Sequence, residues 1–182
     1  MIRYLQHVPF EGLGGIDVWA KANGHQTRAI KVYAGEPFHS AEEFDWLIAL
    51  GGPMNVCQEA AFPFLKGEKL FIERALRAGK MVQGIVLSQL IADVLGCKSC
   101  QKRPRRDRLV SRRVNSGSGG CENLFRFARA FTTFHWHGEM FEIPTGAQRM
   151  AHSAACQNQA FVYGENVCGV QFHPEVTKEI CV

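Results

Sequence analysis

The stretch from Met81 to Leu90, M-V-Q-G-I-V-L-S-Q-L, has the outline of a catalytic turn. A short apolar strand runs into a sharp turn and then a helix, and α/β enzymes hold a nucleophile at this place between small residues, as in G-x-Nuc-x-G. The nucleophile position here is Val86, and the glycine expected just after the turn is missing. The stretch therefore predicts a nucleophile elbow that carries no nucleophilic atom.

The elements around this turn alternate between apolar strands and helices. Strands are predicted over residues 2–8, 27–33, 44–50, 80–86, 131–137 and 166–173, and helices over 16–22, 65–78 and 88–95. This alternation favours an α/β fold with a doubly wound, mostly parallel sheet, in a single domain over residues 1–182. Ligands of such sheets lie beyond the carboxyl ends of the strands, so Gly51-Gly52-Pro53 and Val86-Leu87-Ser88 are expected at one edge.

Composition narrows the class of protein. A chain of 182 residues with 46% hydrophobic content suffices for one core. We find no candidate signal peptide or membrane span, so we expect no membrane partner. Seven cysteines without a secretory signal predict reduced thiols and a cytoplasmic location.

The segment 97–121 is unlike the rest of the chain. It holds eight Lys/Arg against one acidic residue, a net charge of +7, whereas the remaining thirteen basic and sixteen acidic residues give −3. It has no helical or strand periodicity and resembles a disordered basic tail. Phosphate binding and half a zinc site (C97-K-S-C100) are alternatives. The segment has no aromatic residues for base stacking and no second cysteine pair, so we predict no specific nucleic acid and no metal.

Five motifs carry a family resemblance: H7-V-P-F-E-G, L50-G-G-P-M-N-V, S88-Q-L-I-A-D-V-L-G, F134-H-W-H-G-E and G169-V-Q-F-H-P-E-V-T. Together they resemble the class I glutamine amidotransferases, above all the stand-alone GMP synthase-like members. The resemblance covers residues 1–96 and 122–182. G-V-Q-F-H-P-E is a specific signature, whereas G-G-P alone is weak. The resemblance implies a flavodoxin-like sheet whose C-terminal end is truncated, since the family usually continues with a further helix.

The resemblance also implies a Cys-His-Glu triad that hydrolyses glutamine to glutamate and ammonia. His173 and Glu175 match the base and its orienting carboxylate, and Gly51 and Gly52 match the turn that supplies oxyanion N–H groups. Four further residues match positions that line the glutamine pocket: Gln89, His135, Trp136 and His137. The implied partners are glutamine and a separate synthetase or other ammonia acceptor, with no cofactor. Structural roles remain the alternative for the histidines and the glycine pair.

The elbow departs from the family pattern G-I-C-L-G-x-Q, because G84-I-V-L-S-Q89 has valine for cysteine and one residue fewer. Ser88 is a poor replacement, since it lies beyond the turn and its hydroxyl lacks a thiol's acidity. Glutaminase chemistry is therefore expected to fail in this chain, because losing the nucleophile of a triad costs on the order of 10⁶ in turnover.

Residues 97–121 look frameshifted. With permissible codons, a reading one base later turns Cys97 onward into A-K-V-V-K-N-A-Q-E-E-I-G-W-F-P-V-E-L, which resembles the family's sequence after this helix. Dropping one base from codons for C-L-G likewise yields V-L, as at Val86-Leu87. The hypothesis is that two local frame disturbances altered an ordinary amidotransferase, and it predicts that 97–121 has no stable place in the sheet.

The sequence is compatible with two functions. In the first, the chain represents a glutamine amidotransferase that is active in its intact form and delivers ammonia to an acceptor. In the second, it is a non-catalytic relative, a pseudoenzyme that binds glutamine or a partner. The sequence does not identify the acceptor.

Overall fold

The computed structural model describes residues 1–97, 101–102, 110–114, 130–154 and 156–177. Its centre is a run of five parallel strands in the order β2-β1-β3-β4-β11. These strands are β1 (Ile2–Gln6), β2 (Thr27–Lys31), β3 (Trp46–Ala49), β4 (Met81–Ile85) and β11 (Val167–Val170). Strands β3 and β11 are almost wholly buried, as continuous apolar runs in a parallel sheet require.

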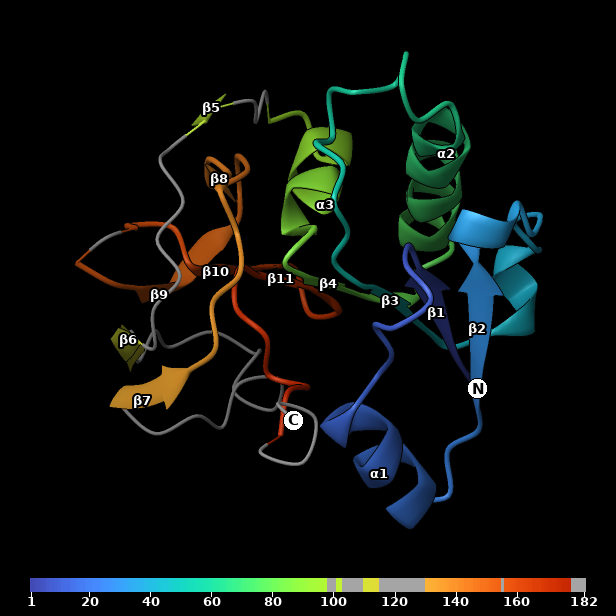
Figure 1. The fold of residues 1–182 in the computed structure, drawn as a ribbon, viewed down its shortest axis with the longest axis horizontal. Coiled ribbons are helices and arrows are strands. Elements are labelled where there is room, and N and C mark those ends of the chain that lie inside the picture. The colour runs from blue at the N-terminus through green and yellow to red at the C-terminus, as the bar shows by residue number, and fades with distance from the viewer. Residues whose placement is uncertain (98–100, 103–109, 115–129, 155, 178–182) are drawn as a thin grey trace.

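Helices cover both faces of this parallel core. Figure 1 shows α2 (Phe64–Arg77) and α3 (Ser88–Val94) on one face and α1 (Gly15–Ala22) on the other. Two single-turn 3₁₀ helices, η1 (Val32–Ala34) and η2 (Ala41–Glu43), lie between β2 and β3. The predicted α/β, doubly wound fold is confirmed, and the predicted elements of this half agree with the observed ones to within a few residues.

Four antiparallel strands extend the sheet beyond β11, in the order β10-β9-β6-β7. They are β10 (Ala160–Tyr163), β9 (Gln148–His152), β6 (Val110–Val114) and β7 (Ala130–Thr133), and a separate pair joins β5 (Gln101–Lys102) to β8 (Glu139–Met140). The sheet therefore has nine strands, of which the parallel ones position the site described below.

The strand β6 corrects the prediction for the segment 97–121. Val110–Val114 pairs with β7 on one side and with β9 on the other. The expectation that the whole segment lacks a place in the sheet is wrong for these five residues. Their neighbours supply backbone pairing on both sides, and such pairing needs no amphipathic pattern in the sequence. Most of the remaining segment lies outside the described residues.

The core consists of two apolar clusters, one on each face of the sheet. Leu47 and Ala49 of β3 point into the cluster under α2 and α3, whereas Ile48 and Leu50 point into the cluster under α1. This alternation follows from the period of two along a strand. Both faces of the parallel strands are thereby covered, and their carboxyl ends become fixed points from which loops can present side chains.

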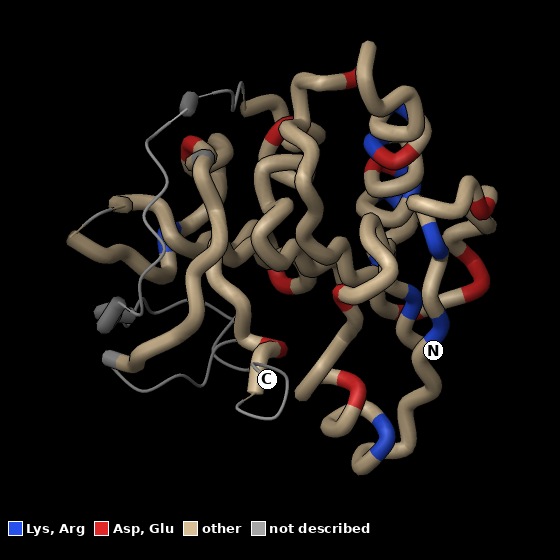
Figure 2. Tube along the Cα trace, viewed as in Figure 1, with Lys and Arg blue, Asp and Glu red and all other residues tan. Residues whose placement is uncertain are grey.

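The charged residues of the described chain are of both signs. Figure 2 shows Lys and Arg interleaved with Asp and Glu along α2. In the part of the chain that the structure describes, no helix is long and apolar enough to cross a membrane. The same part contains no group of three or more potential metal ligands, and Cys100 of the half zinc site lies outside it.

The cysteines differ from one another. Cys97 has a free thiol, whereas Cys57 is disulfide-bonded. The prediction of reduced thiols is therefore wrong at Cys57. Pairing depends on which sulfur atoms the fold brings together, and neither the number of cysteines nor their spacing reveals that proximity.

Candidate active site

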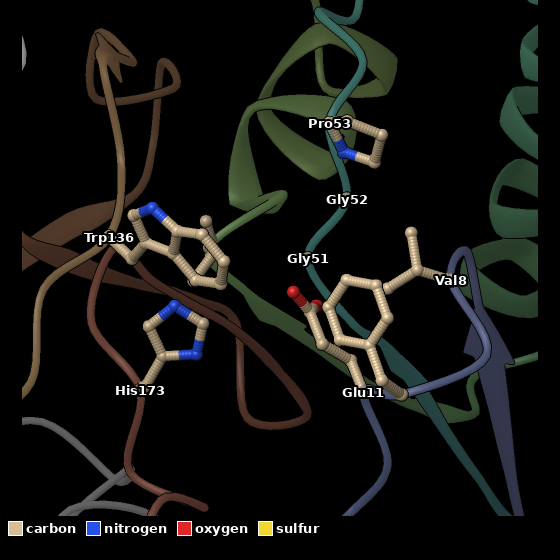
Figure 3. A pocket seen from close by; sticks show the side chains of 9 residues that line it. Val8, Glu11, Gly51, Gly52, Pro53, Trp136 and His173 are labelled. Carbon is tan, nitrogen blue, oxygen red and sulfur yellow. The ribbon is translucent and has the colours of Figure 1, made fainter. Parts of the chain in front are cut away.

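Four parallel strands, β1, β3, β4 and β11, end side by side at the carboxyl edge of the sheet, and a cavity of about 390 Å³ lies there (Figure 3). The residues that line it come from the segments after these strands, with one from the segment after β7: Val8, Phe10, Glu11, Gly51, Gly52, Pro53, Val86, Trp136 and His173. The predicted edge is thus the place where the glycine turn, the elbow and His173 meet.

The elbow keeps the backbone geometry of a nucleophile turn. Val86 has φ +63°, in the left-handed region, and it is the only non-glycine residue with positive φ in the described part of the chain. Leu87 N–H donates to the Ile85 carbonyl at 2.7 Å, so the chain reverses sharply around Val86. A β-branched residue rarely adopts this conformation, which costs on the order of 1–3 kcal/mol. The Val86 side chain nevertheless lines the cavity where a nucleophile would stand.

Close packing holds this turn in place. Val86 N–H donates to the carbonyl of Val170 in β11 at 2.8 Å. A Cβ on Gly84 would lie 2.8 Å from Ser88 Cα, and one on Gly169 would lie 2.9 Å from Ser88 Cβ. Only glycine at both positions lets the first turn of α3 approach β4 and β11 this closely. The packing of α3 on the sheet therefore helps to set the elbow, through contacts that do not involve the side chain at position 86.

Ser88 does not replace the missing nucleophile. Its side chain is fully buried, and Oγ lies 2.6 Å from the carbonyl oxygen of Val170 and 2.9 Å from that of Gly84. A hydroxyl held between two backbone carbonyls at the base of the helix does not face the cavity. The geometry thus agrees with the expectation that Ser88 is a poor substitute.

His173 and Glu175 form a buried pair. The distance from His173 Nδ1 to Glu175 Oε1 is 2.6 Å, and both side chains are more than 90% buried. The backbone fixes the pair from two sides, because His173 N–H donates to the Phe134 carbonyl and the Glu175 carbonyl accepts from Gly15 N–H. With Nδ1–H directed to the carboxylate, Nε2 is the nitrogen that can accept a proton.

The second ring nitrogen of His173, Nε2, is buried and has no partner among the described residues. The ring lies at the cavity wall beside Trp136 (Figure 3). An oriented imidazole with one free nitrogen can take a proton from a nucleophile and return it to a leaving group. The two predicted partners are therefore brought together in the arrangement that their chemistry requires.

The glycine turn after β3 presents backbone to the cavity. A Cβ on Gly52 would lie 2.6 Å from Met54 Sδ and 2.8 Å from His7 Cβ, so position 52 has no room for a side chain. A Cβ on Gly51 would lie 3.3 Å from Val86 Cβ. The turn thus comes within contact distance of the elbow, where backbone N–H groups can stabilise an oxyanion.

A buried ion pair lies behind this turn. His7 Nδ1 donates to the carbonyls of Leu50 and Gly51 at 3.1 Å each, and His7 Nε2 lies 2.9 Å from Glu68 Oε1. Burial lowers the pKa of His7, but the charge of Glu68 and the hydrogen bonds to Glu68, Gly51 and Leu50 outweigh it and hold the pKa above 6.5. Both side chains are completely enclosed. The His7 ring ties the glycine turn to α2.

Glu11 is a site residue that the sequence analysis missed. Its carboxylate lines the cavity, and burial raises its pKa above 4.5. Oε2 lies 3.4 Å from the point where a Cβ on Gly51 would be. The only signal in the sequence was its place in H7-V-P-F-E-G, a motif that supported the family resemblance but gave Glu11 no role.

Three of the predicted pocket residues do not line this cavity. Gln89 is buried, and its Nε2 lies 3.4 Å from Gln171 Oε1. His135 Nδ1 lies 3.1 Å from His137 Nε2, whereas Trp136 between them lines the cavity. The strand predicted to reach His137 ends at Thr133, and the chain beyond it crosses towards His173.

Comparison with known proteins decides the family. The family described as "Glutamine amidotransferase class-I" matches residues 19–180. The chain belongs to this family. It is 32% identical over 185 residues to the glutamine amidotransferase-like protein YfeJ of Salmonella typhimurium, covering 98% of this chain and 77% of that protein.

Two further relatives extend this similarity. A subunit of the glutamine-hydrolysing GMP synthase of Sulfurisphaera tokodaii is 29% identical over 150 residues, covering 81% of this amidotransferase chain and 76% of its own length. The crystal structure of a glutamine amidotransferase from Thermotoga maritima superposes with a TM-score of 0.90 at 30% identity, covering 98% of this chain and 77% of that one. Both the family and the fold predicted from the motifs are therefore confirmed.

Proposed function

We propose that the cavity is a glutamine site. His173, Glu175 and the Gly51–Gly52 turn supply its base, its orienting carboxylate and its oxyanion N–H groups, and Val86 supplies no nucleophile. The observation that carries this proposal is the elbow itself. Val86 holds the left-handed conformation of a nucleophile turn, at the wall of the cavity that His173 also lines. The chain as it stands is inactive, and the pocket residues predicted outside this cavity remain predictions.

In a form with cysteine at position 86, the site has every group that the reaction requires. The cysteine thiolate sulfur forms a bond to the side-chain carbonyl carbon of glutamine, and the backbone N–H groups of the glycine turn stabilise the oxyanion. His173 gives its proton to the leaving nitrogen, so the C–N bond breaks and ammonia departs. His173 then takes a proton from water, which attacks the thioester and releases glutamate. Glu175 keeps the imidazole oriented throughout.

The acceptor of the ammonia is a separate protein in this proposal. Two relatives are named as single subunits of glutamine-hydrolysing GMP synthases, and such a name points to a synthetase on another chain. A cytoplasmic location, where glutamine and such a synthetase would both be present, belongs to the same proposal.

Rebuilding the elbow tests the proposal. We would change Val86 to cysteine and insert glycine after Leu87, giving G-I-C-L-G-S-Q, and replace 97–121 by the shifted reading. Ammonia release from glutamine should rise from background by on the order of 10⁶ and depend on the new cysteine and on His173. Val86→Cys alone should recover little, since the turn would still lack the glycine after Leu87 that lets the backbone approach the substrate. A rebuilt protein that folds cooperatively yet stays inert would contradict the proposed chemistry.

A non-catalytic role is the second candidate, and the burial of Ser88 together with Val86 favours it for the chain as encoded. Sequencing the encoding DNA separates the two candidates. Confirmed reads through both anomalies would make the chain a genuine pseudoenzyme, and glutamine binding without hydrolysis, measured by calorimetry, would be its expected activity.

A further inference from the structure

The carboxylate of Glu11 stands across the cavity from His173. Figure 3 shows its oxygens directed from the segment after β1 towards the His173 side. The main chain beneath it is tied down, since Gln6 Nε2 donates to the carbonyls of Glu11 at 2.8 Å and Pro9 at 3.3 Å. The backbone that carries this carboxylate is therefore fixed at the cavity wall.

This carboxylate lacks a direct partner. Within the part of the chain that the structure describes, Glu11 forms no ion pair and its side-chain oxygens accept no hydrogen bond. The ionisable groups whose charge it feels are His173, Glu175 and His7. Desolvation dominates its environment, and a partly desolvated carboxylate with open lone pairs requires a donor. The cavity can supply that donor only from a bound ligand or water.

The reacting centre lies beside it. Glu11 Oε2 and Val86 Cβ approach the same point at Gly51, at 3.4 Å and 3.3 Å from where a Cβ on that glycine would be. When the side-chain carbonyl of a ligand lies between position 86 and the glycine turn, the other atom on its carbonyl carbon therefore lies near Glu11. That atom is the nitrogen of an amide or the second oxygen of a carboxylate. An amide places N–H donors there, whereas a carboxylate places a like charge.

We propose that Glu11 is a specificity residue that selects a primary carboxamide over a carboxylate at the cavity. Its oxygens accept a hydrogen bond from the amide nitrogen of glutamine and repel the side-chain carboxylate of glutamate. In the intact enzyme the same repulsion would expel the product. This inference rests on the proposed function of the cavity as a glutamine site, and it adds the residue that distinguishes substrate from product.

Calorimetric titration of the full chain with L-glutamine and with L-glutamate at about pH 7.5 tests the inference. The parent chain should bind glutamine about 100-fold more tightly than glutamate, because like-charge contacts and unpaired polar groups are both costly. Glu11→Gln should reduce that ratio to about 3-fold or less, mainly by improving glutamate binding. Glu165→Gln, on the exposed turn between β10 and β11, should keep the parental ratio.

The outcomes separate the two proposals. An unchanged ratio in Glu11→Gln, with thermal unfolding like that of the parent, overturns the role of Glu11 and leaves the glutamine site standing. Failure of the parent chain to bind either amino acid overturns the proposed function and the inference with it. Glu11→Ala serves as a second variant with the same expected loss of discrimination, so the conclusion does not depend on one substitution.

Discussion

The elbow at Val86 and the His173–Glu175 pair lie at the ends of two neighbouring strands, β4 and β11. They differ in whether the reactive side chain accompanies the backbone conformation. The pair has both of the side chains that the family pattern requires, with a 2.6 Å contact between ring and carboxylate. The elbow keeps its backbone only, with φ +63° at a residue that has no nucleophilic atom. Geometry and chemistry are thus separable within one site.

The reason lies in what holds each element. The elbow is shaped by α3 packed on Gly84 and Gly169 and by the hydrogen bond from Val86 N–H to Val170, and none of these contacts involves the side chain at position 86. The histidine pair is held by backbone hydrogen bonds of His173 and Glu175 and also by its own side-chain contact. A substitution at position 86 can therefore remove reactivity from the elbow without breaking the contacts that shape it, whereas a substitution at Glu175 also removes the contact that orients the His173 ring.

The largest effect that tests this comparison is expected from the pair. In the rebuilt chain, Glu175→Gln should lower kcat for ammonia release by roughly 10⁴, because the amide no longer holds the catalytic tautomer or stabilises the imidazolium. Steady-state assays with glutamine measure it, with Glu165→Gln as the matched control. Retention of more than a tenth of the activity would show that the carboxylate is not needed to orient His173.

The second largest effect is expected when the ion pair behind the glycine turn is broken. It should lower the free energy of unfolding rather than the activity. Glu68→Ala leaves His7 buried without its partner, and breaking a buried pair in this way costs about 3–5 kcal/mol in the free energy of unfolding. Urea titration followed by circular dichroism measures the loss. Glu165→Ala, on an exposed turn, should stay within about 0.5 kcal/mol of the parent. A loss at Glu68 as small as that would mean that His7 and Glu68 do not hold the turn.

The smallest effect concerns the strain at the elbow. At an ordinary strand position glycine is about 1 kcal/mol less stable than alanine, and Val82 in β4 should follow this rule when Val82→Gly is compared with Val82→Ala. At position 86 the order should reverse, because φ +63° suits glycine and strains every residue with a Cβ. Urea unfolding of the four variants measures both differences. The same order at the two positions would indicate that the elbow does not hold a left-handed residue in solution.

The sequence predicted most of the parallel half of the fold. Strand β3 could be recognised because W-L-I-A is a short apolar run before a glycine turn, and α2 because its apolar residues recur at helical spacing. Both signals are local. The strand β6 carried no such signal, since its place depends on β7 and β9, which pair with it from distant parts of the chain.

The candidate site divides in the same way. The sequence by itself determined that Gly51 and Val86 gather at one edge, since parallel strands bring their carboxyl ends together, and that the elbow lacks a nucleophile, since that depends on residue identity alone. The structure added His173 to the same edge. Only the tertiary structure decided that Gln89 contacts Gln171, that His7 pairs with Glu68 and that Glu11 faces His173. Those relations depend on helix rotation and on packing between distant segments, and one chain read in order contains no periodicity that reports them.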